Sequence, residues 1–191
     1  MAVRDILQIG HPVLAARADE VDVAAITGPE VQGWVDDMVD TMRHANGAGI
    51  AANQIGIPKR LFIVEIADNP RYPYKPKVPL TVAINPTITF LSEETFVSNE
   101  GCLSVPQIRG NVDRNVEIAV TYYDRDGVFH EQEVRGYSAC TWQHEYDHLD
   151  GILFPHRVSD AQSFCSWAVF QEFQQAAYAD HVKALVAKWG A

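Results

Sequence analysis

The sequence predicts an α+β fold with mixed, mostly antiparallel strands. A helical pattern comes first, strand-like runs fill the middle of the chain, and helical patterns return towards the end. Helices and strands therefore do not alternate as they would around a parallel sheet. Two of the strand-like runs are joined by a tight turn, which is typical of an antiparallel pair. A chain of 191 residues fits one domain, residues 1–191, with enough length to bury a core.

The first predicted helix covers residues 29–45. Pro29 suits its first turn, where a missing backbone N–H costs nothing. Asn46 and Gly47 both tolerate positive φ and are expected to end it. Its predicted apolar face consists of Val31, Trp34, Val35, Met38, Met42 and Ala45.

Strand-like runs follow at residues 61–66, 80–84 and 87–90. Residues 116–123 and 128–134 predict a hairpin, whose turn at 124–127 ends with Gly127 where positive φ is needed. Prolines recur at every third position between residues 70 and 79. This period fits a polyproline recognition segment, but a stiff surface loop between two strands is the simpler interpretation.

A further helix is predicted over residues 139–149, capped by Ser138 and closed by Gly151. Beyond it lies a C-terminal extension, residues 160–191. The second half of this extension has helical spacing, with apolar residues at Val182, Leu185 and Trp189. Its stretch 164–173 fits a strand as well as a helix.

Composition excludes several classes of protein. A net charge of −10 argues against broad electrostatic binding to nucleic acid or to an anionic membrane. The sequence has neither a run of 18 apolar residues nor a secretory signal pattern at its start. Three cysteines are too few for a disulfide scaffold and fit a reducing compartment. We therefore expect a cytoplasmic protein.

The chemistry is concentrated in His144, Glu145 and His148, an H-E-x-x-H pattern on the predicted helix. Residues four apart on a helix share one face, so the two imidazoles can reach a single divalent metal ion. Glu145 lies beside them and can handle a proton. Two ligands and a base are the minimum for metal-assisted hydrolysis.

A hydrolytic metal site generally needs a third protein ligand. Cys140 shares the helix face but lies eight residues from His148, about 12 Å along the axis, which is too far to converge on one ion. Cys102 is the preferred choice, because Gly101 and Pro106 around it predict an irregular turn rather than core. The remaining candidates have simpler interpretations. His130 reads as an exposed strand residue, His156 as a loop residue and Cys165 as core packing.

Three segments together resemble the motifs of the peptide deformylase family. They are GAGIAANQ at residues 47–54, EGCLS at 100–104 and QHEYDH at 143–148, in the family's order and spacing. Residues 6–14 and 149–154 also look like family segments, and the resemblance covers about residues 3–158. It implies strands packed around a central metal-binding helix, with an N-terminal helix and a C-terminal extension.

The resemblance also implies roles for individual residues. Cys102, His144 and His148 would hold an iron(II) ion, with zinc, nickel or cobalt as substitutes. Glu145 would transfer protons, while the Gln54 side-chain amide and the Leu103 backbone N–H would bind the oxyanion. Residues implied to pair with the substrate or to line its pocket are Ala48, Gly49, Glu100, Gly101, Arg109 near the mouth, Tyr137 and Cys140. Asp147 has two open interpretations: it orients a group next to the metal ligands, or it is a solvated acid without a role in the site.

The expected substrates are nascent N-formylated polypeptides, from whose formylmethionine formate is released. Ala48 stands where the family usually has a bulky apolar residue, which predicts a wider pocket. The extension carries Lys183 and Lys188 against three acids, so it lacks a basic helix for docking at the ribosome. A transient contact with the ribosome is still compatible with the sequence. Another H-E-x-x-H metallopeptidase and an inactive deformylase-like binding protein are the alternative interpretations.

Overall fold

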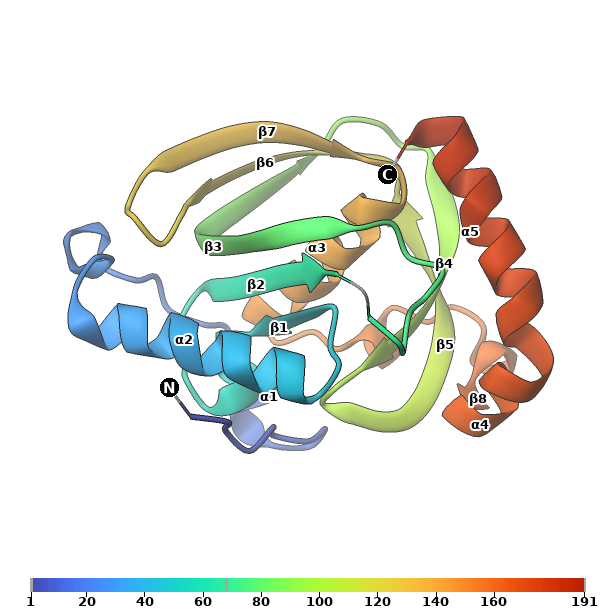
Figure 1. The fold of residues 1–191 in the computed structure, drawn as a ribbon, viewed down its shortest axis with the longest axis horizontal. Helices are drawn as coiled ribbons and strands as arrows, with labels where there is room; N and C mark the ends of the chain where they lie inside the picture. Colours follow the sequence, from blue (N-terminus) through green and yellow to red (C-terminus); the bar gives the residue numbers. More distant parts are fainter. Residues whose placement is uncertain (1, 68, 191) are drawn as a thin grey trace.

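The structure, a computed structural model, describes residues 2–67 and 69–190. Helix α3 (Gly136–Leu149) lies at its centre and contacts strands of two antiparallel sheets (Figure 1). Helix α2 (Pro29–His44) covers one side of the molecule, and helix α5 (Gln175–Trp189) covers the opposite side. The predicted α+β arrangement around a central helix is confirmed.

The larger sheet has the strand order β1-β2-β3-β6-β7, and every neighbouring pair is antiparallel. Side chains alternate along β2 (Leu61–Ile66): Leu61 and Ile63 join the core under α2, whereas Phe62 and Val64 join the core against α3. Both faces of the sheet are therefore covered by helices. The three-residue strand β1 (Gly49–Ala51) forms one of its two edges, and β7 forms the other.

Helix α2 matches the predicted helix to within one residue at its end. Gly28 occupies the N-cap and Pro29 the first turn. The buried stripe follows the predicted face at Val31, Val35, Met38 and Met42, and packs on β1 and β2.

Residues 80–84 and 87–90 are not two strands but parts of one strand, β3 (Val78–Phe90). The register shifts between Ile84 and Thr87, where Asn85 adopts a φ of 49°. The Asn85 side chain forms two 2.8 Å hydrogen bonds with the backbone of Val21. This irregularity bends the strand without ending it. In the sequence the same interruption looked like a gap between two separate strands.

The predicted hairpin is confirmed as β6 (Glu117–Tyr123) and β7 (Phe129–Arg135). In its turn, Asp124 Oδ1 accepts hydrogen bonds from the backbone N–H groups of Asp126 and Val128. Gly127 has the expected positive φ, 76°.

The smaller sheet has the order β4-β5-β8, formed by β4 (Thr95–Cys102), β5 (Val105–Asn115) and β8 (Cys165–Ser166). The expectation of an irregular turn around Cys102 is confirmed in part: Cys102 is the last residue of β4, the register with β5 shifts between Gly101 and Cys102, and Leu103 and Ser104 form a turn. Gly101 pairs with Arg109 and Cys102 with Val105, so residues 106–108 have no partner on β4. Pro106 is tolerated in this unpaired stretch, where its missing N–H is not needed.

Helix α3 begins at Gly136, three residues before the predicted start. Its N-cap is Arg135, without a side-chain cap, so Ser138 lies inside the helix rather than capping it. Gly151, with a φ of 73°, follows its C-terminal end as predicted.

The ambiguous stretch 164–173 contains the short strand β8, the short helix α4 (Trp167–Val169) and most of a π-helical turn, Phe170–Gln174. Helix α5 confirms the helical second half of the extension. Val182 and Leu185 of α5 pack on Phe96 of β4 and on Tyr137 and Cys140 of α3. The hydroxyl of Tyr178, also on α5, accepts a 2.9 Å hydrogen bond from the Asn99 backbone N–H on β4. Short helical turns complete the chain at Pro12–Ala15 (α1), Val23–Ala25, Ala52–Ile55, Phe154–His156 and Ala161–Ser163.

Gly151→Ala is expected to lower the free energy of unfolding by about 2–4 kcal/mol. A Cβ there would lie 2.6 Å from the Ala15 carbonyl oxygen, in a backbone conformation that alanine already disfavours. Gly10→Ala is the matched control, because Gly10 also has positive φ but no neighbour within 4 Å of its Cβ position. Chemical denaturation measures both variants, and equal losses would refute the steric contribution of Ala15.

Candidate metal centre and substrate cavity

Three ligand atoms, from Cys102, His144 and His148, lie within 4.8 Å of one another. Helix α3 supplies the two histidines from successive turns, and the end of β4 supplies the cysteine. Cys102 Sγ is 3.2 Å from His148 Nε2. The Cys102 and His148 side chains are almost fully buried, and Cys102 forms no disulfide within the described part of the chain. The structure thus brings together the three residues that sequence reasoning selected.

Cys102 is held in place by two hydrogen-bond donors. The Ser104 backbone N–H donates to its sulfur at 3.4 Å, and Gln54 Nε2 approaches the same atom at 3.5 Å. Gln54 is itself fixed, because its Oε1 accepts a 2.8 Å hydrogen bond from the Ala51 backbone N–H. The sulfur therefore points at the histidines rather than into the apolar cluster behind it.

His144 is oriented by a buried ionic network. Its Nδ1 lies 2.9 Å from Glu100 Oε2, which leaves Nε2 for the side that faces Cys102. Both carboxylate oxygens of Glu100 accept hydrogen bonds from Arg114, at 2.8 and 2.9 Å. Arg114 also donates to Asp147 at 2.7 Å, and Arg157 binds the other oxygen of Asp147. The network joins β4, β5 and α3 around one ligand.

Burial and charge set the pKa values of these groups. Burial alone would raise the pKa of Glu100, but Arg114 and His144 hold it well below its usual range. Burial would lower the pKa of His144, but Cys102 and Glu100 raise it well above its ordinary value. Burial and the charge of His144 keep the pKa of His148 well below its ordinary value, so His148 is the neutral imidazole that metals bind.

This donor set fits a divalent transition metal. One thiolate and two imidazoles suit iron, zinc, nickel or cobalt better than magnesium or calcium, which prefer oxygen ligands. Three protein ligands leave one tetrahedral position free for a water molecule, as in catalytic rather than structural sites. A carboxylate held against the second nitrogen of His144 is also the usual support for a metal-bound histidine.

Glu145 projects into a cavity beside the three ligands. Its side chain is buried, and its Oε2 has no hydrogen-bond partner within the described residues. A Cβ on Gly49 would lie 2.4 Å from Glu145 Oε1, so only glycine permits this approach. Burial raises the pKa of Glu145 to about 7. A carboxyl that titrates near neutral pH can both accept and donate a proton.

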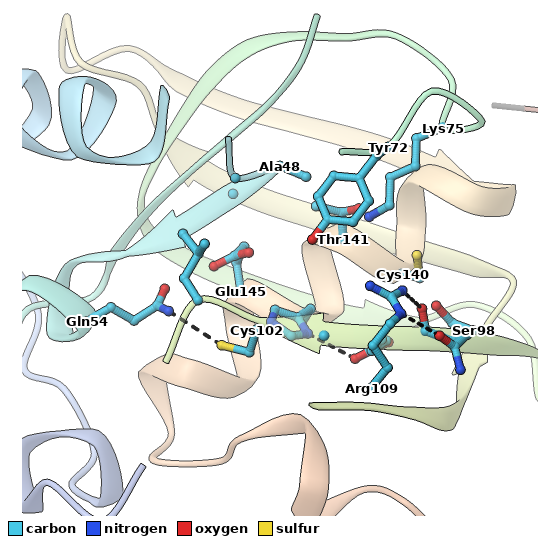
Figure 2. Close-up of a pocket in the computed structure, with 17 residues that line it drawn as sticks. Ala48, Gln54, Tyr72, Lys75, Ser98, Cys102, Arg109, Cys140, Thr141 and Glu145 are labelled. Atoms are coloured by element: carbon cyan, nitrogen blue, oxygen red, sulfur yellow. Dashed lines mark hydrogen bonds and ion pairs between the residues drawn. The ribbon is translucent and has the colours of Figure 1, made fainter. Parts of the chain in front are cut away.

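The cavity has a volume of about 530 Å³, including its mouth (Figure 2). Two unpaired sheet edges border it: Gly49 belongs to the edge strand β1, and residues 98–102 belong to the edge strand β4. The sequence-predicted residues that line it are Ala48, Gly49, Gln54, Glu100, Gly101, Cys102, Leu103, Arg109, Cys140, His144 and Glu145.

Known proteins resemble this chain in sequence and in fold. The polypeptide deformylase family model matches residues 3–164. A peptide deformylase from Leptospira biflexa is 43% identical over 165 residues, which cover 86% of this chain and 92% of that protein. The chain belongs to the peptide deformylase family.

Solved deformylase structures share the fold. The Met-Ala-Ser-bound class I type b peptide deformylase from Acinetobacter baumannii is 39% identical, with a TM-score of 0.79 over 82% of this chain and 99% of that one. An actinonin-bound peptide deformylase from Synechococcus elongatus is 27% identical, with a TM-score of 0.73 over 98% of this chain and 92% of that one. The matched family region ends before β8, so α4 and α5 lie beyond it.

Three expectations for this deformylase need correction. Arg109 is 2% exposed and lies in the cavity wall, not at its mouth. Tyr137 is buried beneath α5, where its hydroxyl contacts that of Tyr178 at 3.0 Å, and it is not among the residues that line the cavity. Asp147 is not a solvated acid, because it is buried between Arg114 and Arg157.

The other candidate ligands lie elsewhere in the deformylase fold. His130 is partly exposed on β7, stacks on Tyr122 and contacts Asp124. His156 Nδ1 accepts a hydrogen bond from the Leu153 backbone N–H. Cys165 is half-buried on the short edge strand β8 rather than in the core, since β8 closes the small sheet near the surface.

Sequence reasoning missed several residues of the site. Tyr72 and Lys75, from the proline-containing loop between β2 and β3, reach into the cavity. This loop is thus more than a surface connection. Ser98, Asn99 and Thr141 complete the lining, and Arg114 organises the ionic network. The only sequence signal for this role of the loop was its three basic residues, which lie between the regularly spaced prolines.

Cys102→Ala is expected to lose bound metal after purification, because a thiolate at the ligand group is removed. Cys140→Ala and Cys165→Ala are the matched controls and should keep it, since neither sulfur belongs to that group. Metal content per chain, measured on the three purified variants, decides the matter. Full metal in Cys102→Ala together with loss in Cys140→Ala would overturn the ligand assignment.

Proposed function

We propose that Cys102, His144 and His148 hold an iron(II) ion, with zinc, nickel or cobalt as substitutes, and that the site built around them performs deformylation. As a peptide deformylase, the chain is a hydrolase that removes the N-formyl group from formylmethionyl peptides and releases formate. The observation that carries the residue assignment is the convergence of the three ligand atoms beside Glu145 in one cavity.

A bound divalent ion would activate a water molecule and polarise the formyl oxygen as a Lewis acid. The protein supplies the remaining parts of the reaction. Glu145 takes a proton from the attacking water and returns a proton to the departing amine, so the carboxyl ends the cycle in its starting state. Its pKa of about 7 suits both transfers.

Gln54 and Leu103 are the proposed oxyanion donors. The Gln54 amide is held by Ala51 with its N–H₂ group towards Ser104 and Cys102, on the ligand side of the cavity. Leu103 follows the cysteine ligand directly and also lines the cavity. Fixed donors aimed at the developing negative charge need no reorganisation during the reaction.

The substrate backbone is proposed to enter as an added strand. The edges of β1 and β4 border the same cavity, at Gly49 and at Glu100 and Gly101. An extended peptide could hydrogen-bond to one or both edges, while its first side chain enters the inner part of the cavity.

The proposed partners are nascent N-formylated polypeptides in the cytoplasm. The three cysteines form no disulfide among the described residues, which suits a reducing compartment. None of the helices in the described ranges is both long and apolar enough to span a bilayer. A basic docking helix for the ribosome is not proposed, because α5 carries only two lysines, Lys183 and Lys188, against Asp180, which is too little positive charge for such binding. Any ribosome contact would be transient.

Hydrolysis of formyl-Met-Ala-Ser by the metal-loaded chain is the direct test of this function. Release of formate is the expected result. Cleavage of internal peptide bonds instead would indicate a metallopeptidase, and peptide binding without turnover would indicate an inactive binding protein.

Glu145→Ala is expected to retain the metal but to lose deformylation by at least about 10²–10⁴-fold, the usual contribution of a positioned acid–base group. The reason is that Glu145 neighbours a ligand but does not belong to the ligand group. Metal content and kcat, measured on the same preparation, separate the two effects. A metal-replete variant with near-normal kcat would assign proton transfer to another group.

Ala48→Ile is expected to lower the activity ratio of formyl-Phe over formyl-Met peptides. Ala48 packs beside Tyr72 in the cavity wall, so added methylenes there should narrow the space for a bulky side chain. The effect should be modest, about 1–3 kcal/mol, because it concerns one or two methylenes. The measurement is kcat/KM for both peptides in both proteins, and an unchanged ratio would place Ala48 outside the first side-chain pocket.

A further inference from the structure

The inner end of the cavity, away from the ligand group, contains two positively charged side chains. Figure 2 shows Gln54 and Cys102 at one end, Glu145 between, and Lys75, Arg109 and Cys140 at the other. A pocket for an apolar methionine side chain needs no cation, and a buried one such as Arg109 is costly to keep there without partners.

Lys75 is presented to the cavity by a fixed turn. Its backbone N–H donates to the Tyr72 carbonyl at 3.1 Å, and Asn69 ties the same loop to the carbonyls of Asn46 and Gly47. The ammonium group lies 4.7 Å from the ring centre of Tyr72 and 5.7 Å from that of Tyr137. These are its contacts among the described residues, and none of them is a carboxylate.

Arg109 approaches the same Tyr72 ring, with its Cζ 6.0 Å from the ring centre. Two of its nitrogens donate to Asn99, each at 2.6 Å, but Nη1 is buried without any partner among the described residues. The side chain is 2% exposed and is packed beneath Phe170 and Trp167. It therefore cannot turn to solvent to satisfy the free nitrogen.

Neither acid that lines the cavity forms an ion pair with Lys75 or Arg109. Glu100 binds Arg114 and His144 with both oxygens. Glu145 points towards Gly49 and the ligand group, and forms no ion pair within the described residues. The charge of Lys75 nevertheless acts across the cavity, where it opposes the rise in pKa that burial causes at Glu145 and at Cys140.

We propose that this inner end is a carboxylate subsite formed by Lys75 and the free Nη1 of Arg109. This inference rests on the proposed function. The enzyme would then deformylate peptides whose first side chain is acidic, in addition to those that begin with methionine. Glutamate suits the cavity because its side chain is close to methionine in length. The same cations could instead receive the terminal carboxylate of a very short formyl-peptide.

The test uses the metal-loaded full chain and peptides amidated at the C-terminus. The ratio of kcat/KM for formyl-Glu-Ala-Ser-amide over formyl-Gln-Ala-Ser-amide should exceed one in the parent protein. In Lys75→Met it should fall by about tenfold, which is the usual loss for a hydrogen bond to a charged group. Lys75→Arg should keep the preference for glutamate.

Lys77→Met is the matched control, because it removes the same charge from the same loop at an exposed position outside the cavity lining. Its ratio should equal that of the parent. Formyl-Met-Ala and its C-terminal amide form a second pair of substrates. A Lys75-dependent preference for the free acid in this pair alone would assign the carboxylate to the chain end.

Absence of a Lys75-dependent preference in both pairs, with normal hydrolysis of formyl-Met-Ala-Ser, would overturn the subsite and leave the deformylase function standing. Failure to cleave any formyl-peptide would count against the proposed function instead. Calorimetric binding of the product peptides Glu-Ala-Ser-amide and Gln-Ala-Ser-amide still tests the subsite in that case. Equal affinities in the parent protein would refute it.

Discussion

The buried contact between Glu100 and Arg114 is the constraint on which the rest of the site depends. Arg114 on β5 holds Glu100 on β4 through two hydrogen bonds and Asp147 on α3 through a third. Buried ion pairs add little to net stability, but loss of one partner typically costs about 3–5 kcal/mol. The pair therefore acts chiefly by position: it sets the small sheet against the central helix, and through Glu100 it directs His144 towards Cys102.

A second constraint is the approach of two sheets from opposite sides of one helix. The larger sheet contributes Gln54 and Gly49 from around its edge strand, and the smaller sheet contributes Cys102 and Leu103. Neither sheet alone holds the proposed metal ligands and the proposed oxyanion donors. The histidines of α3 lie where the two contributions meet, so the chemistry requires the whole domain to be folded. At Gly49 the edge strand β1 comes very close to helix α3, because the carboxyl of Glu145 occupies the space that a side chain on residue 49 would fill.

Sequence reasoning worked where the signal is local. Helix α2, the β6–β7 hairpin and the helix of His144 and His148 each follow from periodicity and turn residues within one segment. It failed at β1, which is too short to show a period, and it did not show that Cys102, beside the expected turn, is itself the last residue of a strand. Lys75 and Arg109 could not be placed in one cavity from sequence, because Lys75 lies in the loop between β2 and β3, Arg109 lies on β5, and both approach the Tyr72 ring only in the folded chain.

The hydrogen bond from Asn99 to Tyr178 has a consequence for the behaviour of the protein at high concentration. An open strand edge bordering a cavity is a template on which other chains can pair and aggregate. Tyr178 occupies the Asn99 N–H of β4, directly next to Glu100, so the open stretch of that edge is interrupted there. Helix α5 lies beyond the matched family region. Through Tyr178 it blocks continuous pairing of the β4 edge with a second copy of the chain, while the rest of the edge stays available to a short peptide.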